Sequence, residues 1–80
     1  MIYYVYILYS SKLDIYYKGF STNIQQRLEY HLNGKSLFTS QVKDWVLVYK
    51  KAFETKKEAL IEEKRLKKLN RTSIEKIINS

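Results

Sequence analysis

IYYVYILYSSKLDIYYKGF occupies residues 2–20 and decides the fold. Residues 2–9 are aromatic and β-branched on both alternating faces, which is typical of a strand that is covered on both sides. Residues 10–14 are polar and predict a turn, and residues 15–20 predict a second strand. The sequence therefore predicts a β-hairpin at the start of the chain.

A helix is predicted directly after this hairpin. Thr22 and Gln25 form a capping box, in which two side chains satisfy the free backbone amides of a first helical turn. The helix is expected from about Asn23 to Asn33. Gly34 stands where a left-handed C-terminal cap belongs, so it marks the end of the helix.

Residues 35–44 are polar and aperiodic, and they predict a loop. The next segment, WVLVYKKAF at residues 45–53, predicts a third strand. Thr55 and Glu58 then form a second capping box. The helix that this box opens is expected to end at about Leu69.

A third capping box, Thr72 with Glu75, predicts a short helix that ends at about residue 79. The predicted order is β, β, α, β, α, α. A hairpin plus one more strand predicts a mainly antiparallel three-stranded sheet flanked by three helices, which is the α+β class. A chain of 80 residues supports one core, so we expect a single domain over residues 1–80.

The charge balance favours a polyanionic partner. Fifteen Lys and Arg face eight Asp and Glu, which gives a net charge of +7. Ten of these fifteen cations lie between Lys50 and Lys76. Nucleic acid is the first candidate and an anionic membrane surface the second. The alternative is a surface that lysines keep soluble. The absence of Cys and the single His exclude disulfides and a Cys- or His-rich zinc site.

Glu63 stands out in the second predicted helix. At 100° per residue it lies about 40° from Ala59, and Leu66 lies about 20° away on the other side. A carboxylate is thus placed in an apolar stripe, where Glu is rarely found unless it is paired or binds a metal. The alternatives to a metal ligand are a buried ion pair with Lys or Arg, or a position at the rim of the stripe.

Arg27 and His31 lie one turn apart on the same face of the first predicted helix. Arginine binds phosphate with two parallel hydrogen bonds, and histidine exchanges protons near neutral pH. The alternatives are a core histidine with satisfied hydrogen bonds and a surface arginine with a packed stem.

The hairpin carries three further candidates. Tyr6 and Tyr17 lie in adjacent predicted strands, so their hydroxyl groups converge if both side chains point to the same face. Most tyrosines of a hairpin serve packing. Gly19 loses packing in its strand, which commonly marks a place where a ligand or another backbone comes close.

These residues together resemble the GIY-YIG nuclease superfamily, and in particular its small single-domain bacterial members. The segments that carry the resemblance are Tyr4 to Leu8, Tyr17 to Gly19, Thr22 to Ile24, Arg27, His31, Asn33 to Gly34, Thr39, Trp45 to Tyr49, Glu58 to Leu60, Glu63 and Lys67. They cover nearly the whole chain. Related proteins include intron homing endonucleases and the incision domain of the bacterial excision-repair nuclease.

The resemblance implies a three-stranded antiparallel sheet with a cleavage site on it. It implies catalytic roles for Tyr6, Tyr17, Arg27 and His31, and it matches Glu63 to the glutamate that binds a divalent metal, Mg²⁺ or Mn²⁺. Two further positions that match the family motifs, and that we assign to substrate binding, are Gly19 and Asn23.

The chain departs from the family motifs at three places. The first motif reads Tyr-Val-Tyr rather than Gly-Ile-Tyr, and Lys18 replaces a usual apolar residue of the second motif. Phe20 stands where the repair nucleases carry a lysine. The resemblance therefore leaves open whether Tyr17 or His31 accepts the proton of the attacking water, since free tyrosine has a pKa of about 10.

We expect an endonuclease that hydrolyses DNA and recognises its shape and backbone rather than a long base sequence. The expected backbone-binding cations are Lys64, Arg65, Lys67, Lys68 and Arg71. The alternatives are a non-catalytic nucleic-acid-binding module and a protein-interaction domain, and a protein partner that supplies substrate specificity remains open.

The N-terminus lacks the basic segment and the cleavage site of a secretory signal, and its longest apolar run is too short to span a bilayer. We therefore expect a complete cytoplasmic protein that does not associate with a membrane.

Overall fold

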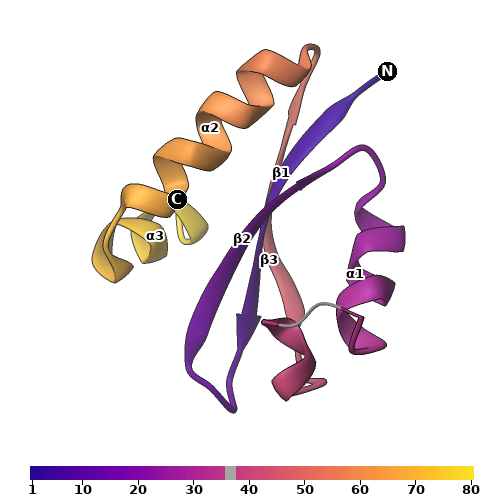
Figure 1. Cartoon of the computed structure of the whole chain (residues 1–80). Helices are drawn as coiled ribbons and strands as arrows, with labels where there is room; N and C mark the ends of the chain where they lie inside the picture. Colours follow the sequence, from indigo (N-terminus) through magenta and orange to yellow (C-terminus); the bar gives the residue numbers. More distant parts are fainter. Residues whose placement is uncertain (36–37) are drawn as a thin grey trace.

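The computed structural model describes residues 1–35 and 38–80, and it confirms the α+β class and the order β, β, α, β, α, α (Figure 1). The strands are β1 (Tyr3–Ser10), β2 (Ile15–Ser21) and β3 (Val46–Phe53). The helices are α1 (Ile24–Leu32), α2 (Lys56–Lys68) and α3 (Arg71–Ile78), with a 3₁₀ turn, η1, at Thr39–Gln41. The predicted loop over residues 35–44 thus contains a short helical turn, and its residues 36 and 37 lie outside the described part.

The three strands form one antiparallel sheet in the order β2-β1-β3. The central strand is therefore the most apolar one, because it is covered on both faces. Tyr6 lies opposite Gly19, and Leu8 lies opposite Tyr17. These four residues consequently share one face of the sheet.

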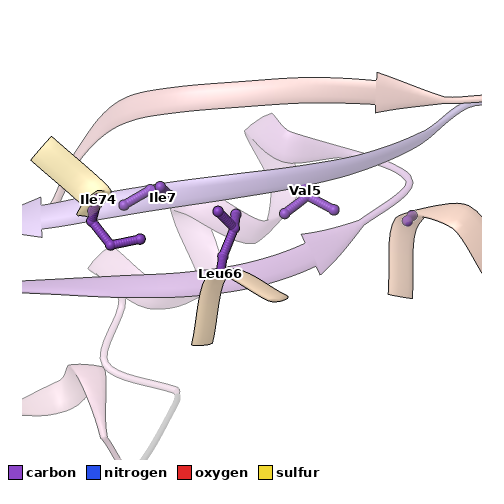
Figure 2. Close-up of a cluster of buried hydrophobic side chains, with 5 residues drawn as sticks. Val5, Ile7, Leu66 and Ile74 are labelled. Carbon is purple, nitrogen blue, oxygen red and sulfur yellow. The ribbon is translucent and has the colours of Figure 1, made fainter. Parts of the chain in front are cut away.

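The other face of the sheet packs against α2 and α3 (Figure 1). Val5 and Ile7 of β1 meet Leu66 of α2 and Ile74 of α3 in a fully buried cluster (Figure 2). Ala59 completes this cluster. Alternation along β1 thus sends the odd-numbered residues toward α2 and α3.

The even-numbered residues of β1 point to the layer that contains α1 (Figure 1). Tyr6 and Leu8 are buried there together with Trp45, which precedes β3. Ile24 and Leu28 of α1 pack against them. This second core, between the sheet and α1, also holds the residues of the candidate site.

Two of the three predicted helix starts are shifted. The Asn23 side chain accepts a hydrogen bond from the backbone N–H of Gln26, so Asn23 and not Thr22 caps α1. Asn70 and not Thr72 caps α3 in the same way. Asparagine accepts such bonds at least as well as threonine, so it takes the cap when it lies nearby. The Thr55 cap of α2 is confirmed.

Gly34 is confirmed as the residue that ends α1. Its φ of +72° lies in the left-handed region, and its N–H donates to the carbonyl of His31 at 3.1 Å. A side chain at this position would strain the backbone.

Two carboxylates fasten the β1-β2 turn to later parts of the chain. Asp44 accepts hydrogen bonds from the hydroxyl of Ser10 and from the backbone N–H of Lys12. Asp14, in turn, pairs with Arg71 of α3 at 2.6 Å. The β1-β2 turn is therefore bonded both to the loop before β3 and to α3.

Candidate active site

The side chain of Tyr6 fills the space that a side chain at position 19 would need. The ring of Tyr6 lies across the β2 backbone so closely that a Cβ atom on Gly19 would overlap its hydroxyl end. The sequence suggested a ligand or another backbone at Gly19, and the structure instead places the Tyr6 side chain there. Glycine is needed at this position because any other residue would displace the ring.

His31 is fully buried below this pair and has a partner for each ring nitrogen. Its Nε2 lies 3.0 Å from the Tyr6 hydroxyl, and its Nδ1 lies 2.8 Å from the hydroxyl of Thr39. Burial, helped by the positive charge of Arg27, lowers the pKa of His31. The geometry is that of a satisfied core histidine that stays neutral at pH 7.

Thr39 anchors this network to the loop before β3. It is fully buried, and its backbone carbonyl accepts a hydrogen bond from the Trp45 indole at 2.9 Å. Sequence analysis had noted Thr39 only through the family resemblance. A polar residue in an irregular loop gives no periodic signal, so its burial could not be predicted from spacing.

Tyr17 lies on the same face, and more of its surface is exposed than that of Tyr6. Its ring meets the edge of His31 at a centroid distance of 4.9 Å. The expected convergence of Tyr6 and Tyr17 on one face of the sheet is thus present, with His31 in contact with both.

Arg27 extends from the edge of α1. Its guanidinium carbon lies 4.5 Å from the ring centre of Tyr30. Its Nε atom is buried and has no hydrogen-bond partner among the described residues. A buried donor without an acceptor is costly, which points to an acceptor supplied from outside.

A surface hollow of about 260 Å³ opens beside this guanidinium. It is lined by Gln26, Arg27, Glu29, Tyr30, Asn33 and Lys35. Two of the lining side chains are cationic and one, Glu29, is anionic, so the hollow has an excess of positive charge.

The pKa of the Tyr6 hydroxyl depends on the charges of both Arg27 and Glu63. Burial raises the pKa of this hydroxyl, and the charges of Tyr17 and Glu63 add to the rise while Arg27 opposes it. The three groups that affect the Tyr6 hydroxyl come from β2, α1 and α2. The structure thus brings Tyr6, Tyr17, Arg27 and Glu63 into one neighbourhood.

Glu63 lies at the rim of the α2 stripe and not in its centre. Its side chain is 19% exposed and forms an ion pair with the exposed Lys67, one turn further along, at 3.5 Å. Of the alternatives open from the sequence, the rim position is present, whereas the ion pair with Lys67 is exposed and not buried. Since this pair is long and reaches the solvent, Glu63 is only weakly committed to it.

Glu62 is the carboxylate that sequence analysis missed. It is less exposed than Glu63, at 12%, and it receives two hydrogen bonds from Arg65 at 2.7 and 2.8 Å. These bonds lower the pKa of Glu62. Its helical angle, about 300° from Ala59 and beside Leu66, would have placed it in the stripe.

A divalent cation fits Glu63 only as a site with a single protein carboxylate. The described residues contain no group of three His, Cys, Asp or Glu that could enclose a metal. Mg²⁺ commonly binds through one or two carboxylates and completes its shell with water and substrate phosphate oxygens. The donor set at Glu63 matches that pattern.

The remaining predicted binding residues differ in their surroundings. Asn23 is engaged as the cap of α1. The five predicted backbone-binding cations divide into two groups: Arg65, Lys67 and Arg71 are ion-paired, whereas Lys64 and Lys68 are exposed and form no ion pair within the described chain. Arg71 joins Asp14 and Glu75, so it holds α3 in place.

A search of the solved structures gives a match over 99% of this chain and 84% of the other chain. The match is the solution NMR structure of the UPF0213 protein BH0048 from Bacillus halodurans, at 32% sequence identity and a TM-score of 0.64. The curated proteins give no match. Within the described part of the chain, no helix has the length and apolarity needed to cross a membrane.

The scan of protein families gives a match over nearly the whole chain. Residues 2–77 match the family described as the GIY-YIG catalytic domain, which is a nuclease family. The match spans all three strands and the helices that carry Arg27 and Glu63. The chain therefore belongs to the GIY-YIG family of nuclease domains.

Proposed function

We propose that this protein is a metal-dependent endonuclease that hydrolyses DNA phosphodiester bonds and selects its substrate by structure rather than by sequence. The observation that carries the proposal is the buried Nε of Arg27, which has no partner among the described residues and lies in the neighbourhood of Tyr6. A non-bridging phosphate oxygen is an acceptor that would satisfy it.

Arg27 binds the scissile phosphate in this proposal. The Tyr30 ring covers one side of its guanidinium and limits its motion. A guanidinium held in this way donates without reorganising when charge builds up on the phosphate, which is the main requirement for stabilising the transition state.

Glu63 holds the divalent metal, which supplies charge neutralisation at the phosphate when it is bound. The carboxylate exchanges its long contact to Lys67 for the metal, at little cost because that contact is exposed.

Tyr17 orients the attacking water and accepts its proton, alone or with a further group. His31 competes for that role on chemical grounds alone, but its ring is fully buried and both nitrogens already have partners. We therefore assign His31 and Tyr6 to support, where they position the face on which Tyr17 acts. General base catalysis requires contact with the water, which Tyr17 has the exposure to make.

The test is the nicking of supercoiled plasmid by the purified protein with Mg²⁺, with Mn²⁺ and with a chelator. We expect cut strands only with metal, and loss of cutting in Arg27→Ala and Glu63→Gln. A protein that shifts DNA in gels and leaves every strand intact under all conditions is the non-catalytic binding module instead.

A further inference from the structure

Three aromatic rings lie in a row from the core to the surface of the candidate site. Trp45 is buried, and its ring meets Tyr17 at a centroid distance of 6.3 Å. Tyr17 is stacked on Phe38 at 5.8 Å with an angle of 29° between the rings. Phe38 ends the row and is 49% exposed. It is thus the residue that presents an aromatic surface to the solvent beside Tyr17.

Phe38 is held firmly despite this exposure. It precedes Thr39, which is fully buried and bonded to His31. The side chain of Gln41 donates to the carbonyl of Phe38 at 3.2 Å. The backbone at Phe38 is therefore anchored, and the stacking on Tyr17 orients the ring. A ring that is already oriented loses less entropy when it binds a flat ligand.

We propose that Phe38 is a stacking platform for an unpaired nucleobase next to the scissile phosphate, so that the row Trp45, Tyr17, Phe38 is continued by a base of the substrate. This inference rests on the proposed function, because it places the phosphate at Arg27 and the water at Tyr17. Bases stack on exposed aromatic rings with little regard to sequence.

The surroundings favour a nucleotide over a protein partner at Phe38. The chain has a net charge of +7, and the hollow on α1 is lined by the cations Arg27 and Lys35 with the single carboxylate Glu29. The other large exposed apolar pair, Leu60 and Ile61, lies on α2, across the sheet. An apolar group beside cations near a phosphate site matches a nucleotide, which combines a flat base with an anion.

The base must be unpaired or easily unpaired. A base inside a duplex already stacks on both of its neighbours, and taking it out of the stack costs free energy. Single strands, flaps, gaps and branch points offer a free base without this cost. The inference therefore names the substrate class as DNA with an unpaired nucleotide at the cut.

The experiment measures binding without catalysis. An oligonucleotide that carries the fluorescent base 2-aminopurine is titrated with protein in a chelator, in single-stranded and in fully paired form. We expect the single strand to bind with quenched fluorescence. Phe38→Ala and Phe38→Leu should weaken this binding about fivefold or more, whereas Phe38→Trp should retain it. Ile61→Ala, which removes an exposed apolar group on α2, is the matched control and should bind normally.

The two aromatic-removing variants separate stacking from stability, since Phe38→Leu keeps the apolar bulk. Equal affinity of Phe38→Leu and the wild type for the single strand overturns the inference, and so does an equal loss for single strand and duplex. Quenched binding without any metal-dependent cutting supports the platform and removes the proposed nuclease activity. If Phe38→Ala and Phe38→Leu bind the single strand and cut DNA as the wild type does, the nuclease activity is supported and the platform is overturned.

Discussion

The Nε2 atom of His31 lies 3.0 Å from the hydroxyl oxygen of Tyr6, in a position with no exposed surface for the imidazole. The other ring nitrogen is bonded to Thr39. Both nitrogens of the buried ring therefore have hydrogen-bond partners within the described chain. The single histidine of the chain is a structural residue of the site. Its protonation should therefore change the free energy of unfolding.

Acidification should destabilise the protein through His31. Burial lowers its pKa in the folded state, so below the ordinary value of about 6.5 the unfolded state binds the proton first. The free energy of unfolding should therefore fall as pH drops below about 6.5, by up to about 1.4 kcal/mol for each pH unit. Urea melts between about pH 7.5 and about pH 5.5 measure this slope.

The control is His31→Asn, which removes the only histidine. This variant should be less stable at every pH, because it loses two buried hydrogen bonds, and its stability should change little over the same pH range. A slope as steep as that of the wild type would assign the effect to other groups.

Glu63→Gln should abolish metal-dependent cutting and leave the fold intact. Its ion pair with Lys67 is long and exposed, so the free energy of unfolding should change by less than about 1 kcal/mol. Plasmid nicking and thermal melts measure the two effects.

The neighbouring Glu62→Gln is the matched control. It breaks a two-bond pair with Arg65 and should cost about 1 kcal/mol of stability, while cutting survives. A reversal, with Glu62→Gln inactive and Glu63→Gln active, would move the metal ligand by one residue.

Tyr17→Phe should lower the cutting rate by a factor of about 100 or more, since a general base typically contributes that much. No hydrogen bond of the Tyr17 hydroxyl is recorded within the described chain, so the melting temperature should barely change. Single-turnover cleavage gives the rate. Normal cutting by this variant would show that Tyr17 contributes only its ring.

Lys64 and Lys68 should carry more of the DNA affinity than the cations that are ion-paired. Removing both as alanines should reduce the slope of log affinity against log salt by about 2. Removing Lys12 and Lys43, which are exposed on the loops that flank β2 and β3, changes the net charge equally and is the control. Equal slopes in the two double variants would mean that only net charge matters.

Much of the fold could be predicted because its signals are periodic or local. The hairpin at residues 2–20 follows from two aromatic and β-branched runs separated by a polar turn, and the Thr55 cap and Gly34 follow from local hydrogen-bonding rules. The caps of α1 and α3 could not be separated from neighbouring Thr residues, since Asn23 and Asn70 offer the same chemistry one or two positions away.

The sequence predicted which residues belong to the candidate site better than it predicted how they are arranged. Spacing placed Arg27 and His31 on one helical face. Only the structure shows that His31 is fully buried and that the Nε of Arg27 has no hydrogen-bond partner among the described residues. Phe38 and Thr39 lie in a non-repetitive loop, where side-chain direction depends on contacts with the rest of the molecule. No period in the sequence encodes such contacts.

Gly19→Ala should destabilise the protein by about 1 to 3 kcal/mol, because the added methyl group meets the Tyr6 ring. Tyr6→Leu in the same chain should relieve most of this cost. A double-mutant cycle of unfolding free energies measures the coupling. Additive effects of the two changes would mean that the ring moves aside freely.

Because the Tyr6 ring fills the space beside Gly19, the substitutions that each of the two positions tolerates depend on the other. A larger residue in the second strand is tolerated only after the ring in the first strand has been reduced, and a reduced ring leaves a void until the glycine is enlarged. Each single step passes through a less stable protein. The two motifs are therefore expected to be inherited as one unit, although they lie on separate strands that the turn of residues 11–14 connects.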